Sequence, residues 1–334
     1  MSLHSLTAAA LATLSLSAFA APTPQYQVTD RIKIGGEGRW DFVQVDAQAR
    51  RLFVSHGSQV EVFDLDSNAK VGTIADTPGV HGIVTADDLG LGFVSNGKDD
   101  SVTVFDLVTM QAKTRIAVGK SPDAMTYVPA LKRVVVFNGH SKNLSVIDAS
   151  SLKVIGTVAL PGKPEVSALS QDGLVYVNVE DTGELATFDP KAMKVVRRVK
   201  LAGCEEPSGL ALDDKSNVYS VCANHVMKVT SPALKPLATV AIGGGPDGVV
   251  WTNGYAFSAN GSDGNLTVVG TDSAGKWSAV ATVPTEFGAR TIAHDPVTGR
   301  LYLPTADFLP GSSDSEKRKT MPDTFRVLVL APGR

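Results

Sequence analysis

The sequence lacks the short motifs by which many enzymes are recognised. Its 334 residues contain no Gly-x-Ser-x-Gly, no His-Glu-x-x-His and no Walker loop. The Cys-x-x-Cys-His site for covalent attachment of c-type haem is also missing. These absences argue against nucleophile-elbow hydrolases, zincins, P-loop nucleotide-binding proteins and c-type cytochromes.

Positive charge is scarce as well. The net charge is −3, from 31 Lys and Arg against 34 Asp and Glu. The only run of three basic residues, 317–319, lies beside Asp314 and Glu316. Binding to nucleic acid without sequence preference depends on Lys and Arg that neutralise phosphates. We therefore expect no nucleic-acid partner.

A long apolar run occurs only at the N-terminus. Residues 1–20 contain no Asp, Glu, Lys or Arg and end in Ala18-Phe19-Ala20, a small-x-small cleavage pattern. A basic residue near the start is missing, and the alternative is a disordered or buried apolar N-terminus. We predict a signal peptide at residues 1–20 and a single domain at 21–334, periplasmic or secreted. The run is too short to span a membrane, so we expect no membrane span, and we expect a monomer.

What the chain does have is an internal repeat. Apolar residues that anchor similar strands recur at separations of 38 to 45 residues: Phe53, Phe93, Val135, Tyr176, Tyr219, Phe257 and Tyr302. A period of about 40 to 45 residues built from short alternating strands is typical of β-propeller blades. The sequence therefore predicts an all-β, seven-bladed β-propeller with four antiparallel strands per blade and almost no helix.

The third strand of several repeats ends in an aspartate. These residues are Asp64, Asp106, Asp148 and Asp189. Aspartate side chains commonly accept hydrogen bonds from the backbone of the turn that follows them. We expect these residues to form turns.

The two ends of the chain predict how the ring closes. Residues 28–36 resemble a fourth strand although no blade precedes them, and the last repeat supplies only three strands, within residues 291–330. We expect the N-terminal strand to complete the last blade and close the ring without a covalent link.

Several of the repeat motifs resemble those of a known family. Residues 93–96 (Phe-Val-Ser-Asn), 176–178 (Tyr-Val-Asn) and 257–260 (Phe-Ser-Ala-Asn) are similar to the Tyr-Val-Thr-Asn motif of the YVTN-repeat, YncE-like propellers. Residues 245–249 and 121–125 resemble that family's Pro-Asp-Gly motif. The resemblance covers about residues 27 to 332 and implies an exported seven-bladed propeller with diverse ligands.

Antiparallel strands bring two kinds of connection to one mouth of the central channel. They are the segments that lead into each blade, called lead-in segments below, and the loops between second and third strands, called tips. The site residues that we predict there for ligand binding are His81, Asp123, Glu165, Asp247, Arg290, Asp41 and Asn96. For metal binding we name His56 and His81.

Ordinary structural roles are the alternatives for these residues. Aspartates after proline, such as Asp123 and Asp247, often only bond the backbone of a turn, and Asn96 before a glycine suits a left-handed turn. A histidine at a loop tip is commonly a surface residue. His81 and Arg290 break the acidic pattern of the lead-in segments, and the fold does not demand such departures.

The chain contains two cysteines, Cys204 and Cys222. They map to the lead-in segment and the second strand of the fifth blade, so both reach one mouth of one blade. In an oxidising compartment we expect a disulfide between them. A redox or soft-metal site that includes His225 is the alternative.

Residues 306–324 form a tip far longer than its six counterparts. The segment has no apolar periodicity, which suits a flexible surface excursion. A lid over the channel mouth is the functional alternative.

Three functions are consistent with the sequence. The first is a non-catalytic exported propeller that binds a small ligand, a metal ion or a protein partner at the mouth. The second is a metal-dependent hydrolase or lactonase with a divalent cation held there. The third is an electron-transfer accessory that uses the cysteines or a non-covalent cofactor. The sequence names no cofactor beyond a divalent metal: oxygen ligands suit Ca²⁺, Mg²⁺ or Mn²⁺, whereas histidines favour Zn²⁺ or Cu²⁺.

Overall fold

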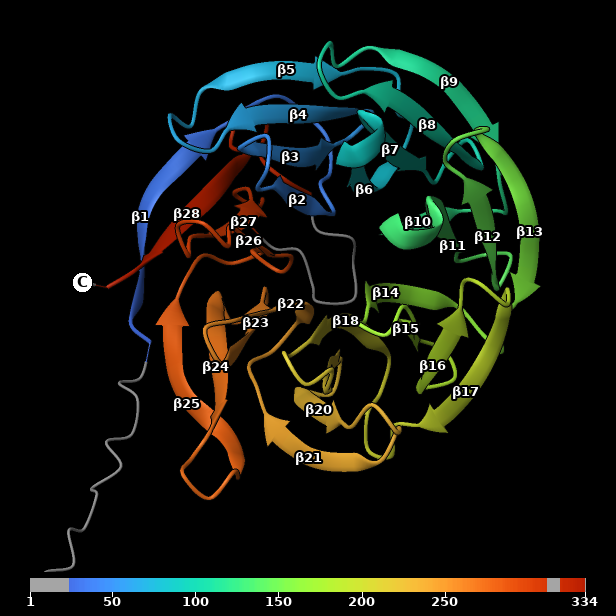
Figure 1. Cartoon of the computed structure of the whole chain (residues 1–334). Helices are drawn as coiled ribbons and strands as arrows, with labels where there is room; N and C mark the ends of the chain where they lie inside the picture. The colour runs from blue at the N-terminus through green and yellow to red at the C-terminus, as the bar shows by residue number, and fades with distance from the viewer. Residues whose placement is uncertain (1–23, 311–318, 334) are drawn as a thin grey trace, which may run out of the picture.

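Seven four-stranded antiparallel sheets form a ring around a central axis in the computed structural model, which describes residues 24–310 and 319–333 (Figure 1). The expected seven-bladed propeller is confirmed. The predicted signal peptide, residues 1–20, lies outside the described residues.

The first three blades follow one another along the chain. Blade 1 consists of β2 (Val43–Asp46), β3 (Arg51–His56), β4 (Gln59–Asp64) and β5 (Lys70–Ile74). Blade 2 consists of β6 (Val80–Ala86), β7 (Leu91–Asn96), β8 (Ser101–Asp106) and β9 (Ala112–Ala117). Blade 3 consists of β10 (Pro122–Val128), β11 (Arg133–Asn138), β12 (Asn143–Asp148) and β13 (Lys153–Ala159).

The next three blades repeat the same order. Blade 4 consists of β14 (Pro164–Leu169), β15 (Val175–Val179), β16 (Glu184–Asp189) and β17 (Lys194–Lys200). Blade 5 consists of β18 (Pro207–Leu212), β19 (Val218–Cys222), β20 (Val226–Thr230) and β21 (Pro236–Ala241). Blade 6 consists of β22 (Pro246–Thr252), β23 (Tyr255–Asn260), β24 (Asn265–Thr271) and β25 (Trp277–Pro284). The only helices in the described part of the chain are the 3₁₀ turns η1 (Asp87–Leu89) and η2 (Pro129–Leu131).

Blade 7 is assembled from both ends of the chain, as expected. Its sheet has the order β1 (Tyr26–Lys33), β28 (Arg326–Pro332), β27 (Leu301–Thr305) and β26 (Ala293–His294). Strand β1 pairs with β28 from Tyr26 opposite Pro332 to Lys33 opposite Arg326. The strand ends at Lys33, before the end of the expected range 28–36. The backbone N–H of Ile34 still donates to Phe325 O at 2.9 Å.

The core lies between neighbouring blades. The middle strands are covered on both faces, so the repeat anchors are buried, with Phe53, Phe93 and Phe257 at 0% exposure. The rings of Phe53 in blade 1 and Phe105 in blade 2 lie 5.9 Å apart, which shows packing across a blade boundary. Because one sheet cannot bury both faces alone, each blade depends on its neighbours.

The recurring aspartates form turns. Oδ1 of Asp64 accepts the backbone N–H of Ser67 at 2.8 Å, and Oδ1 of Asp148 accepts that of Ser151 at 2.7 Å. Asp189 accepts the N–H of Lys191 in the same way. These side chains close the turn between the third and fourth strands.

Cys204 and Cys222 form the expected disulfide, which links the lead-in segment of blade 5 to the end of β19. The pairing consumes both cysteines, so no thiol remains for the redox or soft-metal alternative. A cross-link over this separation of 18 residues stabilises the fold by roughly 3 kcal/mol on the chain-entropy estimate.

None of the helices in the described residues has the length and apolar character to cross a membrane.

We predict that ring closure depends on β1. A chain that starts at residue 36 should melt at least about 10 °C below one that starts at residue 21, measured by differential scanning calorimetry. The shorter chain loses the β1–β28 ladder and the burial of Ile32, which alone contributes roughly 1.5–3 kcal/mol. The full chain from residue 1 serves as the control for changes upstream of β1. Equal midpoints for the two truncated chains would contradict the closure account.

Candidate functional site

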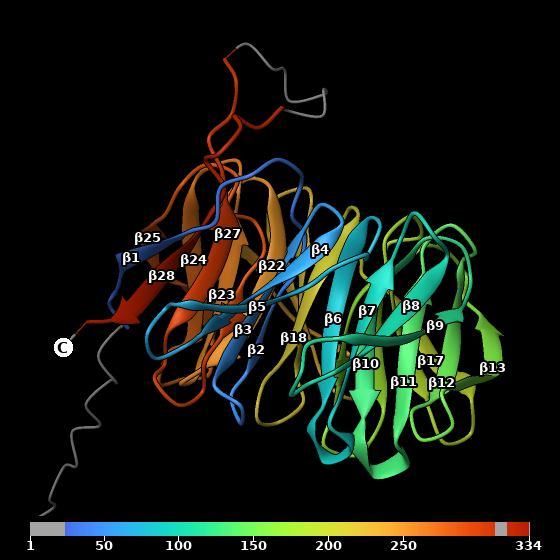
Figure 2. The same ribbon diagram turned by 90° about the horizontal axis from the view of Figure 1, so that it is seen from above.

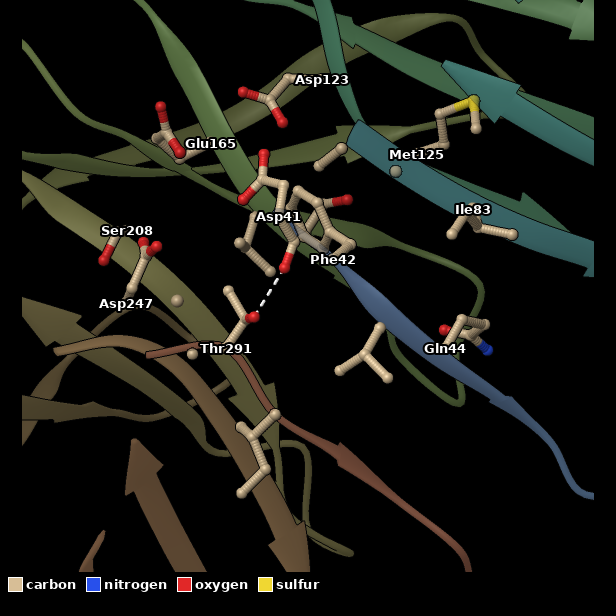
Figure 3. A pocket seen from close by; sticks show the side chains of 18 of the residues that line it. Asp41, Phe42, Gln44, Ile83, Asp123, Met125, Glu165, Ser208, Asp247 and Thr291 are labelled. Carbon is tan, nitrogen blue, oxygen red and sulfur yellow. Dashed lines mark hydrogen bonds between the residues drawn. The ribbon is translucent and has the colours of Figure 1, made fainter. Parts of the chain in front are cut away.

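The predicted carboxylates meet at one mouth of the channel. A cavity of about 400 Å³ follows the first strands of the blades, and five carboxylates line it: Asp41, Asp123, Glu165, Glu180 and Asp247. Most of them come from lead-in segments or from the start of a first strand, as Figure 3 shows for Asp41, Asp123, Glu165 and Asp247. Three of these residues, on three different blades, also approach a histidine or an arginine.

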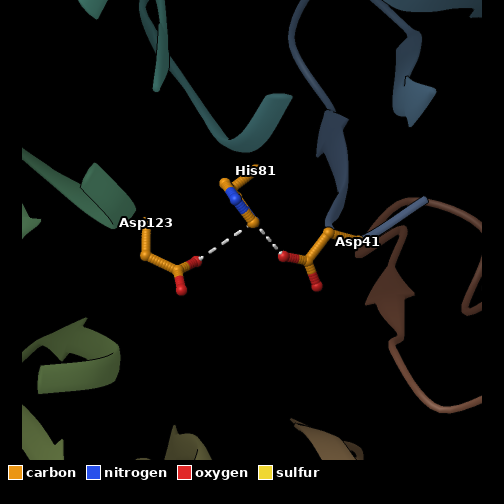
Figure 4. Close-up of side chains that lie close together, drawn as sticks. All are labelled: Asp41, His81 and Asp123. Carbon is orange, nitrogen blue, oxygen red and sulfur yellow. Dashed lines mark hydrogen bonds and ion pairs between the residues drawn. The ribbon is translucent and has the colours of Figure 1, made fainter. Parts of the chain in front are cut away.

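His81 stands between two of the carboxylates (Figure 4). Its Nδ1 lies 2.5 Å from Oδ2 of Asp41 and 3.8 Å from Oδ1 of Asp123. One ligand atom from each of the three residues lies within 4.8 Å of the other two. We call these residues the Asp-His-Asp cluster. Asp41 comes from the lead-in segment of blade 1, and His81 and Asp123 come from the start of the first strands of blades 2 and 3, so the cluster depends on close packing of three of the seven blades.

His81 is held in its charged form. Burial lowers its pKa, but the hydrogen bond to Asp41 and the charges of Asp123, Asp41 and Glu165 outweigh that effect and raise the pKa to about 9. At neutral pH the Nδ1 proton therefore lies between His81 and Asp41. The imidazolium is the internal counter-ion of the cluster.

The pKa values of Asp123 and Glu165 are raised as well, which for a carboxyl group favours the uncharged form. Burial and the charge of Asp41 raise the pKa of Asp123, and burial and the charge of Asp123 raise the pKa of Glu165. Oδ1 of Asp123 is also buried without a hydrogen-bond partner among the described residues. Negative charge at the mouth is thus only partly balanced by the protein itself.

Two further cations are already paired. Nζ of Lys163 lies 2.7 Å from Oε1 of Glu165 and also contacts Glu180. Nε of Arg290 donates to Oδ2 of Asp247 at 2.8 Å, and its NH2 lies 3.8 Å from Oδ1 of Asp41. The sequence analysis named Arg290 but not Lys163, which lies two residues before Glu165 and could have been noticed there.

The backbone around the cluster is fixed by buried hydroxyl groups. Oγ of Ser55 accepts the N–H of Asp41 at 2.8 Å, and Oγ of Ser95 accepts the N–H of Gly82 at 2.8 Å while donating to Asp123 O at 2.6 Å. Thr291 donates to Asp41 O at 2.6 Å, drawn as the dashed line in Figure 3. These bonds join blade 7 to blade 1 and blade 2 to blade 3, and they fix the backbone at Asp41 and Asp123.

Two glycines leave room for the residues that break the acidic pattern. A Cβ on Gly97 would lie 2.6 Å from Nε2 of His81, and one on Gly261 would lie 2.7 Å from Cβ of Arg290. The imidazole of His81 and the side chain of Arg290 therefore each lie directly against a glycine of a tip.

Asn96 and His56 are placed differently from the other predicted residues. Asn96 is fully buried, and its amide donates to Ser101 and Thr103 of β8, so it does not line the cavity. His56 is 5% exposed and lies outside the Asp-His-Asp cluster, with Nδ1 3.6 Å from Oε1 of Glu61. We therefore leave both residues out of the proposed cation site.

The comparison with protein-family models agrees with this architecture. The model of the YNCE-like beta-propeller family matches residues 38–294, most of the chain. The chain belongs to the YNCE-like β-propeller family. A chain of hydrazine synthase from Kuenenia stuttgartiensis has the same fold, with a TM-score of 0.70 and 18% identity over 81% of this chain and 93% of that chain. The comparison with curated proteins gave no match. At this identity the structural likeness shows the fold alone.

The long tip of this YNCE-like propeller begins and ends as a short hairpin. Phe308 bridges to Thr320, and the N–H of Met321 donates to Asp307 O at 2.8 Å. The flanks rise from one face of the ring (Figure 2), and the Phe308 ring lies 6.0 Å from Trp40, next to Arg290. The middle of the loop, 311–318, for which the sequence suggests a surface excursion or a lid, lies outside the described residues.

We predict that His81 titrates near pH 9 and that Asp41 is the main cause. NMR titration of the imidazole in metal-free protein should give a pKa of about 9. In Asp41→Asn the pKa should fall by at least one unit, because the hydrogen bond to the carboxylate is lost while burial still lowers the pKa. Asp214→Asn, on the exposed turn before β19, is the control and should leave the value unchanged. A wild-type pKa near 6.5 would contradict this electrostatic account.

Proposed function

We propose that this propeller binds one divalent cation at the channel mouth, without catalysing a reaction, and that Asp41, His81 and Asp123 are its ligands. The observation that supports this most is the convergence of one imidazole and two carboxylates within 4.8 Å. The three residues belong to three blades, so no local turn requires them to meet.

The donor set favours a transition-metal ion. Imidazole nitrogen together with carboxylate oxygen suits Zn²⁺ and Cu²⁺, whereas Ca²⁺ and Mg²⁺ prefer oxygen ligands alone. Three protein ligands leave at least one coordination position for water or another molecule. We expect Zn²⁺ or Cu²⁺ to bind more tightly than Ca²⁺.

Charge also favours a cation at this place. Five carboxylates line the cavity, while Lys163 and Arg290 each bond to carboxylates of it already. The raised pKa of Asp123 and its Oδ1, which has no hydrogen bond among the described residues, both indicate unbalanced negative charge. A divalent ion would supply two positive charges next to that carboxylate.

Binding would exchange a proton for the metal. The 2.5 Å separation of His81 Nδ1 and Asp41 Oδ2 is shorter than the roughly 3.4 Å between two ligands of one tetrahedral ion with bonds of about 2.0–2.1 Å. The hydrogen bond must therefore open and the Nδ1 proton must leave. Proton release on binding is a direct consequence.

A second candidate is metal-dependent hydrolysis of an ester or lactone. Glu165 favours it, because burial and the charge of Asp123 raise its pKa, so that it can carry a proton at neutral pH near the cluster. A panel of esters and lactones assayed with Zn²⁺-loaded protein separates the two functions. Turnover that disappears in Glu165→Gln would favour the hydrolase.

We also propose that the chain is exported to the periplasm or beyond and acts as a monomer. The disulfide and the N-terminal pattern of the sequence support export. N-terminal sequencing of the mature protein should begin at Ala21, and light scattering should give the mass of one chain. A mature protein that begins at Met1 would refute export by this route.

We predict that Zn²⁺ binds with one-to-one stoichiometry in isothermal titration calorimetry. The affinity should rise about tenfold between pH 6.5 and 7.5, because His81, with a pKa of about 9, must lose its proton. Asp123→Asn and His81→Gln should each weaken binding at least tenfold. His294→Gln, a histidine bonded to Thr252 away from the cluster, is the matched control and should bind as wild type. Equal binding by all three variants would refute the site.

A further inference from the structure

A second hollow adjoins the cation site on the side of blade 1. It has a volume of about 810 Å³ and is lined by residues 36–41, 56–59 and 78–81 together with Lys98 and Arg290. We call it the blade 1 groove. Asp41 lines both this groove and the channel cavity, and His81 of the cluster lines the groove as well. A molecule in the groove would therefore lie next to two of the proposed metal ligands.

The groove follows from a shortened tip. Only residues 57–58 separate β3 from β4, whereas residues 97–100 separate β7 from β8 in blade 2. The segment that leads from β1 towards β2 runs beside this short tip, where the N–H of Gly57 donates to Arg39 O at 2.7 Å. The space that a longer tip would fill in other blades stays open here.

The groove carries positive charge, unlike the channel. Arg39, Lys98 and Arg290 line it, against Glu37 and the cluster residue Asp41. Within the described residues, no carboxylate lies at salt-bridge distance from Lys98 or Arg39. Two basic side chains without counter-ions beside an acidic channel favour a ligand with a negative charge.

Trp40 in the groove wall supports an acceptor ligand independently. It is 5% exposed, and its indole N–H finds no acceptor in the described part of the chain. A buried donor without an acceptor is costly, and an anionic oxygen can supply the missing partner. The guanidinium of Arg290 lies 6.0 Å from the centre of the same ring, so charge and donor are close together.

We propose that the blade 1 groove binds a small carboxylate-bearing molecule that also coordinates the cation at the Asp-His-Asp cluster. One carboxylate occupies the coordination position that the three protein ligands leave free. The rest of the molecule lies in the groove, where Lys98 faces its second negative group and Trp40 supplies a donor. This inference rests on the proposed cation site and specifies the ligand class that accompanies the ion.

The test is a calorimetric titration of glutarate, a weakly chelating dicarboxylate, into the full chain with and without Zn²⁺. A Zn²⁺ titration of each protein comes first. We expect Zn²⁺-loaded wild type to bind glutarate at least tenfold more tightly than metal-free protein. Lys98→Gln should weaken binding to the loaded protein at least fivefold, and Trp40→Phe, which keeps the ring but removes the N–H, should weaken it at least threefold. Lys120→Gln, an exposed lysine that does not line the groove, is the matched control and should bind as wild type.

The outcomes separate the two proposals. If wild type binds Zn²⁺ but glutarate binding is independent of the metal or of Lys98, the groove inference is wrong and the cation site stands. If wild type does not bind Zn²⁺, the proposed function fails at the first titration, and the combined site fails with it. A Trp40→Phe variant that unfolds, seen by circular dichroism, leaves the Lys98→Gln result to decide.

Discussion

The backbone ladder between β1 and β28 is the constraint on which the rest of the molecule depends. It joins the two ends of the chain within one blade and thereby fixes the segment that leads from Lys33 to Val43. Asp41 lies in that segment, and its backbone is bonded to Ser55 of blade 1 and Thr291 of blade 7. If the ring did not close, Asp41 would have no fixed position relative to His81 and Asp123. The closed ring and the candidate site thus both depend on the pairing of β1 with β28.

Electrostatics explains why a tightly closed ring can carry a binding site. Packing of blades brings carboxylates together that would repel one another in water, and the ladder and the core supply the free energy that holds them there. Lys163 pairs with Glu165, and Arg290 pairs with Asp247 and approaches Asp41. His81 faces both Asp41 and Asp123 and keeps its proton to about pH 9. The Asp-His-Asp cluster is therefore the part of the mouth where the electrostatic energy favours binding of an added cation most.

The sequence predicts the fold well because the fold follows from local rules. The spacing of 38 to 45 residues between Phe53, Phe93 and their counterparts indicates the number of blades. The missing fourth strand of the last repeat indicates that the N-terminal strand closes the ring. The lead-in positions of Asp41, His81 and Asp123 follow from strand direction alone. Their distances do not, because they depend on how closely neighbouring blades approach, which involves glycines such as Gly97 and bonds such as that from Ser95 to Asp123 O.

Asn96 shows where sequence reasoning fails and what signal it overlooked. A residue at the end of a second strand can turn towards the channel or back into its own blade, and periodicity does not distinguish these directions. Hydroxyl or amide partners five and seven residues later recur after Asn96, Asn138 and Asn260, and they accept the buried amide of each. In blade 1 the corresponding positions hold His56 and Glu61, with 3.6 Å between Nδ1 and Oε1.

The most direct test of the account is an anomalous difference map from crystals of the full chain grown with Zn²⁺ and measured at the zinc absorption edge. The account predicts one dominant peak at about 2.0–2.2 Å from Nδ1 of His81 and from one carboxylate oxygen each of Asp41 and Asp123. A map in which zinc binds elsewhere, or in which His81 Nδ1 keeps its hydrogen bond to Asp41 with no peak between them, would contradict it.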